Sequence, residues 1–303
     1  MRAGDVKRSE LGWISKRLGM GRASTREFYA WTRRLRHWRE LSLRRRRIPE
    51  IAGSPDLVIP PDRGYTVVPA GRISEADEIA EITRRLVDAA LRGTPAVGKK
   101  SQLLTGLLPK EELTPDSPFI RFALRPDVVR CVSDYLGVIP LLTALDVWAS
   151  LPSSELANSQ LYHCDWADLS QVKVFVHGSD VDSDSGPLVV LGATESESVR
   201  RSVGYRWRGD RYRISDKTMG SLVADGDSRE LLGPAGTVAL VDTCRCFHYG
   251  SRLSKPGAPR ALCVMQFSLP STFASPSDPE ERAPFRDLAT PEMSGIERLV
   301  LSV

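Results

Sequence analysis

Hydrophobic residues beyond position 140 occur in short runs that are separated by polar turns. The runs that predict strands are 141–150, 159–163, 172–177, a segment starting at Gly186-Pro187, 236–242 and 260–269. Many short strands with turns between them are typical of a jelly roll. We therefore expect a mainly β fold with flanking helices, built on a double-stranded β-helix (jelly-roll, cupin-like) core at about residues 140–270.

Before that point, apolar residues recur at the helical period. Two helices are predicted, over 74–91 with Gly93 as its stop and over 126–135 with Gly137 as its stop, and 64–69 predicts a short strand. Each glycine follows the last periodic residue, where a helix most often ends in the left-handed conformation. Such helices would cover one face of the β core.

Residues 1–50 are strongly basic, with 15 Lys and Arg against 5 Asp and Glu, whereas the rest of the chain contains 27 against 33. The sequence Ser24–Glu27 predicts a capping box at the start of a helix. A proline-rich linker is predicted at 48–61. Between them, apolar side chains recur at helical spacing, namely Phe28, Trp31, Leu35 and Trp38. We call these four residues the aromatic stripe, and we predict a basic helical arm over 1–50.

Several roles fit this arm. Its aromatic stripe could dock on the body of the protein, or the arm could lie as an amphipathic basic helix on an anionic membrane surface. An acidic partner is a further candidate, and we do not expect nucleic acid, because a basic run alone is only an electrostatic footprint. An Arg-rich targeting peptide is disfavoured by Glu27 and Glu40.

Composition bears on the class of protein and on its cellular compartment. Of its 303 residues 41% are hydrophobic, which is enough for a sizeable core. The chain contains no apolar run of about 18 residues, so no membrane span is predicted. No apolar segment follows the basic N-terminus, so no secretory signal peptide is predicted either. The five cysteines are scattered and odd in number. They do not predict a disulfide framework, and we expect a cytoplasmic protein.

The candidate chemistry centres on His163 and Asp165. Side chains two apart in a strand share a face, so an imidazole and a carboxylate can close on one ion. His248 follows the apolar run 237–241 and is the candidate third ligand. Two histidines and one carboxylate on a β scaffold match the facial triad of non-haem Fe(II) oxygenases, which leaves coordination positions open.

Arg260, which opens the last predicted strand, is the candidate cosubstrate anchor. Its guanidinium can grip a carboxylate through two parallel hydrogen bonds, as the far end of 2-oxoglutarate requires. Arg252, four residues after His248, competes for that role. Further candidate cosubstrate contacts are Lys173, Gln160 and Ser251. Lys173 could reach the cosubstrate if its strand face lines the barrel.

Four blocks in this order resemble the phytanoyl-CoA dioxygenase family of Fe(II)/2-oxoglutarate oxygenases. They are His163-Cys-Asp165, Ser185-Gly-Pro-Leu188, Gly236 to Leu240 leading to His248-Tyr-Gly-Ser251, and Arg260. The resemblance implies that His163, Asp165 and His248 bind Fe(II) and that Arg260 anchors 2-oxoglutarate. The resemblance covers about residues 140–270. From length and the strand pattern we expect a single oxygenase domain over 51–303, with an insertion at 195–235.

Together, triad and resemblance predict a dioxygenase that uses O2 and 2-oxoglutarate to hydroxylate a C–H bond of a small metabolite. Because position 165 is Asp, no ligand position is vacated for chloride, which favours hydroxylation over halogenation. Desaturation, epimerisation or oxidative demethylation would use the same ligands. The alternative is a non-catalytic jelly-roll binding or scaffolding protein with a basic interaction arm. A zinc site with Cys244 and Cys246 is a minor alternative, since their spacing with His248 is unusual for zinc.

The insertion carries six arginines within 200–213, interleaved with aromatic residues around Gly209-Asp210. We interpret it as a polar hairpin. It is either a solvated surface loop or a lid whose arginines, Arg206 and Arg208 among them, receive an anionic substrate. His177, after the metal turn, is interpreted as structural because three ligands are already assigned.

Overall fold

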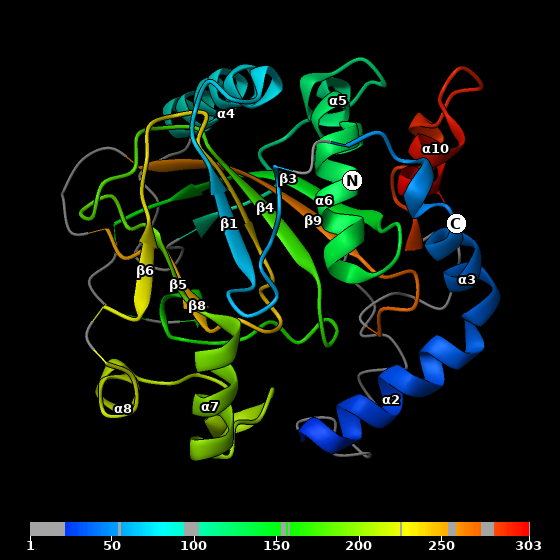
Figure 1. The fold of residues 1–303 in the computed structure, drawn as a ribbon. Helices are drawn as coiled ribbons and strands as arrows, with labels where there is room; N and C mark the ends of the chain where they lie inside the picture. The colour runs from blue at the N-terminus through cyan, green and yellow to red at the C-terminus, as the bar shows by residue number, and fades with distance from the viewer. Residues whose placement is uncertain are drawn as a thin grey trace.

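The computed structural model describes residues 22–53, 56–93, 103–152, 156, 158–224, 226–253, 259–273 and 282–302. Within these ranges, two antiparallel sheets face each other (Figure 1). The larger sheet has the order β1 (Tyr65–Val68), β7 (Val238–Val241), β4 (Val172–His177), β9 (Arg260–Ser268), β3 (Leu141–Ser150) and β2 (Leu103–Leu104). The smaller sheet has the order β6 (Ser228–Leu231), β5 (Leu188–Leu191) and β8 (His248–Tyr249).

Helices flank this pair of sheets. They are α2 (Ala23–Arg36), α3 (Trp38–Arg46), α4 (Ser74–Gly93), α5 (Pro118–Leu124), α6 (Pro126–Leu136), α7 (Ala193–Val203), α8 (Asp216–Gly220) and α10 (Gly295–Leu301). Short 3-10 turns are η1 (Ile48–Glu50), η2 (Lys110–Glu112), η3 (Asn158–Gln160), η4 (Gly209–Arg211) and η5 (Arg286–Leu288). Figure 1 shows α4, α5 and α6 along one side of the sheets, and α7 and α8 together at another end.

Alternation along the strands sorts side chains into two cores. On β4, Val172, Val174 and Val176 pack in the core shared with the helices, whereas Phe175 belongs to a second cluster. That second cluster joins the facing surfaces of the two sheets, and its members include Phe175, Leu188, Val190, Leu262 and Val264. We call the space that these side chains line the barrel interior. This two-sheet arrangement confirms the predicted jelly-roll class.

Most predicted elements are confirmed in position. The helix predicted at 74–91 is α4, and the helix predicted at 126–135 is α6, which ends at Gly137 with a φ of 71°. The strands predicted at 64–69, 141–150, 172–177, 236–242 and 260–269 are β1, β3, β4, β7 and β9. The run 159–163 is instead a 3-10 turn followed by isolated bridges at Tyr162 and His163.

The prediction of a polar hairpin in the insertion is wrong. This segment begins with α7 and continues through η4 and α8. Gly209, with a φ of 72°, lies in a 3-10 turn and not at a hairpin tip. The interleaved Tyr205 and Trp207 are buried in a third cluster with Tyr162 and Phe247, so they act as core residues of the insertion. Aromatic burial therefore decides the local structure here.

The arm docks through the face opposite to the expected one. All four residues of the aromatic stripe are 57% to 65% exposed, whereas Arg26, Arg33 and Arg44 are buried. Arg26 donates to the carbonyls of Trp166 and Asp168, at 3.0 and 2.7 Å. The guanidinium groups thus satisfy backbone carbonyls that no apolar side chain could serve. The expectation that the stripe packs on the body is therefore wrong.

Two further expectations about the arm have different outcomes. Helix α2 begins at Ala23, and its N-cap Arg22 makes no side-chain cap hydrogen bond, so the predicted capping box at Ser24 is wrong. Residues 1–21 of the predicted arm lie outside the described residues. None of the helices in the described part of the chain is long and apolar enough to cross a membrane. All five cysteines are free and buried.

Candidate metal centre

Backbone pairing brings the two halves of the site together. The His163 N–H donates to the His248 carbonyl at 3.1 Å, and the His248 N–H donates to the His163 carbonyl at 3.0 Å. The Asp165 N–H donates to the Thr243 carbonyl at 2.7 Å, which fixes the turn after His163. The predicted ligand stretches, far apart in sequence, therefore lie side by side at one end of the smaller sheet.

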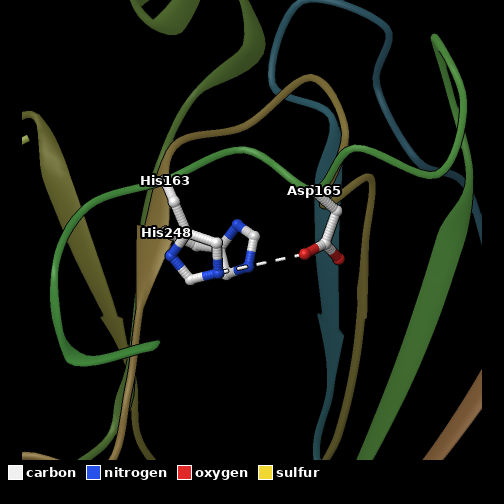
Figure 2. A group of neighbouring side chains, drawn as sticks. All are labelled: His163, Asp165 and His248. Atoms are coloured by element: carbon white, nitrogen blue, oxygen red, sulfur yellow. Dashed lines mark ion pairs between the residues drawn. The ribbon is translucent and has the colours of Figure 1, made fainter. Parts of the chain in front are cut away.

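Three side chains converge at this position. One ligand atom from each of His163, Asp165 and His248 lies within 4.8 Å of the other two, and these residues form the group in the described chain that could hold a metal ion. Figure 2 shows the two imidazoles side by side, with the Asp165 carboxylate facing them. The His163 Nε2 and Asp165 Oδ1 atoms are 3.9 Å apart.

The ring orientations leave the Nε2 atoms free to bind. The Nδ1 atom of His163 lies 2.8 Å from the Leu161 carbonyl oxygen, and that of His248 lies 3.0 Å from the Cys246 carbonyl oxygen. A carbonyl oxygen only accepts, so Nδ1 carries the proton in each neutral ring. Each Nε2 then has a lone pair for a metal, and the backbone fixes the ring.

Two donors orient the Asp165 carboxylate through its other oxygen. Lys173 Nζ lies 2.7 Å from Asp165 Oδ2, and Gln171 Nε2 lies 3.0 Å from the same atom. Gln171 also donates to the Thr243 hydroxyl at 2.9 Å, so its amide is held in place. Because both donors occupy Oδ2, the Oδ1 atom remains for a metal.

The protonation states suit a cation. Burial is the main cause that lowers the pKa of His163 well below its ordinary value, and burial likewise lowers the pKa of His248. Burial alone would raise the pKa of Asp165, but Lys173 and the two imidazoles outweigh it, so this pKa is lowered. Neutral imidazoles and an ionised carboxylate are the forms that bind metals. The donor set therefore fits a divalent ion.

Arg260 is buried in the barrel and has no carboxylate partner among the described residues. Its Nη1 donates to the Gly186 carbonyl, and its Nη2 lies 3.3 Å from the Ser150 hydroxyl and 3.2 Å from the Ser251 hydroxyl. Its Nε has no hydrogen-bond partner. Burial lowers the pKa of Arg260 to about 10. Such a desolvated cation is suited to receive a carboxylate.

The guanidinium of Arg260 also lies close to the His248 strand. A Cβ added to Gly250, two residues after His248, would lie 3.5 Å from Arg260 Nη2. The competing Arg252 is already engaged, because its Nη1 and Nη2 each lie 2.9 Å from an oxygen of Asp216. Geometry therefore favours Arg260 over Arg252 as the anchor for a dicarboxylate.

The other predicted cosubstrate contacts have different surroundings. Lys173 faces the barrel interior but contacts Asp165, so its observed contact is with the carboxylate of the candidate metal centre. Gln160 Nε2 donates to the Ser251 carbonyl at 2.6 Å, and the Ser251 hydroxyl lies 2.8 Å from that of Ser150. Gln160 thus braces the loop that carries Ser251, which itself contacts Arg260.

The remaining candidates lie outside the group. His177 is buried at the opposite end of β4 from Lys173. Its pKa is lowered to about 4, mainly by burial and secondly by the positive charge of Arg260. Cys244 and Cys246 are buried, and burial raises the pKa of both thiols well above the ordinary value. Neither cysteine belongs to the group of side chains in the described residues that could hold a metal ion.

Sequence reasoning missed one contact of the centre and did not single out another. Gln171 lies two residues before Lys173, and the shared parity was the signal that could have identified it. Arg213 appeared only among the insertion arginines, although its positive charge is one of the causes that lower the pKa of His163, after burial and His248. No sequence signal places Arg213 there, because its position depends on strand pairing.

No protein-family model matches the chain, and no curated protein matches it. Among solved structures, the chain is similar to EctD from S. alaskensis with 2-oxoglutarate and 5-hydroxyectoine, at 14% identity over 74% of this chain and 81% of that one, with a TM-score of 0.49. HygX from Streptomyces hygroscopicus with nickel and 2-oxoglutarate bound shows 15% identity over 69% and 83%, with a TM-score of 0.45. The epimerase SnoN in complex with Fe3+, alpha ketoglutarate and nogalamycin RO shows 16% identity over 85% and 91%, with a TM-score of 0.47.

At these identities and TM-scores, the likenesses carry no argument about what this chain binds or does. The resemblance to the phytanoyl-CoA dioxygenase family therefore stays a prediction.

Proposed function

We propose that this chain is an Fe(II)/2-oxoglutarate-dependent dioxygenase that hydroxylates a C–H bond of a small anionic metabolite. The observation that carries the proposal is the convergence of His163, Asp165 and His248 within 4.8 Å, with both Nε2 atoms left free. Two imidazoles and one carboxylate are the donor set of the facial triad, which suits Fe(II) and keeps positions open. His163, Asp165 and His248 are the proposed ligands.

The residues around the triad have distinct proposed tasks. Arg260 binds the far carboxylate of 2-oxoglutarate, and the Ser150 and Ser251 hydroxyls position its guanidinium. Gln171 and Lys173 hold Asp165 Oδ2 and so fix the direction of Oδ1. Fe(II), when bound with 2-oxoglutarate and O2, supplies the oxidative chemistry.

The barrel interior supplies the dry surroundings that such chemistry needs. Phe175, Val190 and Val264 are buried members of the cluster between the sheets. These side chains exclude water, which strengthens the interaction between Arg260 and a carboxylate. A hydrophobic wall beside a charged anchor is also the usual composition of a small-molecule site.

Anaerobic spectroscopy tests this function directly. Fe(II) and 2-oxoglutarate added to the purified protein should give the weak visible charge-transfer band of a bidentate keto acid. The band should be lost in His248→Ala and retained in His177→Ala. Failure of the wild type to give the band at saturating Fe(II) and 2-oxoglutarate would favour the non-catalytic scaffold instead.

For the arm, we propose that α2 and α3 lie on an anionic membrane surface. The aromatic stripe is exposed, and Arg34, Arg36, Arg39 and Arg45 are exposed on the same two helices. Aromatic side chains flanked by arginine are the composition of helices that lie in the lipid interface. The docked arginines hold the arm in the orientation that presents this stripe outward.

A further inference from the structure

Strand pairing places Arg213 beside the metal centre. Tyr162 and Ile214 form an antiparallel bridge, in which the Ile214 N–H donates to the Tyr162 carbonyl at 2.9 Å. In that register Arg213 lies opposite His163, and opposite residues of an antiparallel pair project to the same face. Tyr162 and Ile214 are buried in the cluster of the insertion, so His163 and Arg213 project to the other side.

A row of three residues results across the edge of the smaller sheet. His248 pairs with His163, and Arg213 follows as the next position outward. The ring of Tyr212 links the two outer members, because the Arg213 guanidinium lies 4.2 Å from its centroid and the His163 ring lies 6.1 Å from it.

Arg213 differs from the other arginines of the insertion in what it contacts. Its Nη1 atom is buried and has no hydrogen-bond partner, and no ion pair joins it to a carboxylate in the described part of the chain. Arg200 and Arg201 both pair with Glu197. Arg206 and Arg208 are exposed. The cation at the centre is therefore Arg213, and Arg206 and Arg208 lie in solvent.

A buried guanidinium nitrogen without an acceptor is costly, so its retention calls for a ligand. We infer that Arg213 binds the anionic group, a carboxylate or a phosphate, of the substrate. Arg260 remains the separate site for the far carboxylate of 2-oxoglutarate, because its guanidinium lies beside Gly250 and the two serine hydroxyls. This inference rests on the proposed function for the identity of the substrate site, and it names the residue that selects for charge.

The first experiment measures the thermal midpoint of the protein without added anions. Arg213→Met keeps most of the side-chain volume and removes the unpaired charge, so Tm should rise relative to the wild type. Arg206→Met, at an exposed arginine of the same segment, is the matched control and should leave Tm nearly unchanged. A clear drop of Tm in Arg213→Met alone would show that the guanidinium is already satisfied within the fold, and would overturn the inference.

The second experiment measures anion binding to the Ni(II)-loaded protein, with and without 2-oxoglutarate. The probes are inorganic phosphate, benzoate and its neutral match benzamide, at constant ionic strength set with chloride, and the readout is the shift in Tm. At least one anion should stabilise the wild type and Arg206→Met more than benzamide does. In Arg213→Met the anion should bind about tenfold or more weakly, and Arg213→Lys should restore part of the binding.

The outcomes separate this inference from the proposed function. An equal anion shift in Arg213→Met and wild type, or no anion-specific shift in the wild type, overturns the role of Arg213. Loss of 2-oxoglutarate binding in Arg213→Met would place the residue in the cosubstrate site and overturn it as well. If 2-oxoglutarate fails to bind the wild type, the proposed function fails, yet a phosphate or benzoate shift that depends on Arg213 would still support the anion site. Comparison of the two probes shows whether phosphate or carboxylate is preferred.

Discussion

Arg44 in the arm and Arg260 in the barrel are both buried arginines, but their hydrogen bonding differs. Arg44 contacts Glu40 and donates to the carbonyls of Ile139, Pro140, Leu299 and Ser302, with distances between 2.6 and 3.4 Å. Arg260 contacts one carbonyl and two hydroxyls, and its Nε has no partner. The pKa of each is lowered to about 10, by burial that Glu40 partly offsets for Arg44 and by burial alone for Arg260.

Hydrogen bonding distinguishes a structural buried charge from a candidate binding residue. Arg44 ties α3 to α10 and to the residues before β3, so every donor nitrogen is used within the fold. Arg260 is left with unused hydrogen-bonding capacity that points to a ligand. A saturated buried cation stabilises the fold, and one that keeps an unpaired N–H in the barrel interior is a candidate binding site.

Removal of a proposed ligand should have the largest effect on function. His163→Ala, Asp165→Ala and His248→Ala should each abolish 2-oxoglutarate turnover and weaken metal binding by more than the roughly 10- to 100-fold typical of outer-shell changes. Succinate formation and a metal titration measure the two effects. His177→Ala is the matched control and should keep most of the turnover. The ligand assignment is wrong if His177→Ala is inactive while Asp165→Ala retains metal and turnover.

Arg44→Met should have the largest effect on stability. Five acceptor contacts are lost at a fully buried position, and Glu40 keeps only weaker contacts with His37 and Arg282 at 3.6 Å. Loss of one partner from such a network costs about 3–5 kcal/mol in free energy of unfolding. Urea denaturation measures it, with Arg45→Met, at an exposed neighbour, as control. A loss below about 1 kcal/mol would contradict the structural role of Arg44.

Arg260→Met should weaken 2-oxoglutarate binding more than it lowers stability, the reverse of what is expected for Arg44→Met. Because a buried charge without a carboxylate partner is removed, the free energy of unfolding should stay within about 1 kcal/mol of the wild type or rise. The affinity for 2-oxoglutarate should fall by about one to two decades, and metal binding should remain. Titration of the charge-transfer band measures this affinity. If Arg252→Met carries the whole loss and Arg260→Met none, the two arginines exchange roles.

The β core and the ligand stretches could be predicted because both follow local patterns. Alternation places Val172, Val174 and Val176 on one face of β4, and His163 and Asp165 stand two residues apart in the sequence. Gly137 similarly marks the end of α6. In each case, the physical signal lies within a few residues along the chain.

Two features could not be predicted, because they depend on contacts between distant segments. The orientation of α2 follows from carbonyls at Trp166, Asp168, Ser271 and Thr272 that accept from Arg26 and Arg33. A hydrophobic periodicity rule assigns the aromatic stripe to the buried face and takes no account of these acceptors. The place of Arg213 likewise depends on the pairing of Ile214 with Tyr162, which no local pattern specifies.

Gln171→Leu should have a moderate effect, because it removes one of the two donors that orient Asp165. Metal affinity should fall by about tenfold, as is usual when an outer-shell contact to a ligand is lost. Gln266→Leu is a matched control, since the Gln266 amide donates to the hydroxyls of Thr143 and Ser268 and not to Asp165. Equal metal affinities in the two variants would mean that Lys173 alone orients the carboxylate.

The smallest effect on stability, and a specific effect on binding, is expected for the aromatic stripe. Because Trp31 and Trp38 are exposed, the double variant Trp31→Ser/Trp38→Ser should change the free energy of unfolding by less than about 0.5 kcal/mol per site. Co-sedimentation with vesicles of phosphatidylcholine and phosphatidylserine should decrease clearly, whereas Leu222→Ser, at an exposed apolar residue outside the arm, should bind like the wild type. Binding of the wild type should also weaken with added salt and with vesicles of phosphatidylcholine alone.

If the wild type does not bind anionic vesicles, the membrane proposal is wrong, and the exposed stripe then points to an acidic protein partner. If instead the double variant unfolds much more easily, the stripe supports the fold, and the contrast between its exposed aromatic residues and the docked arginines disappears.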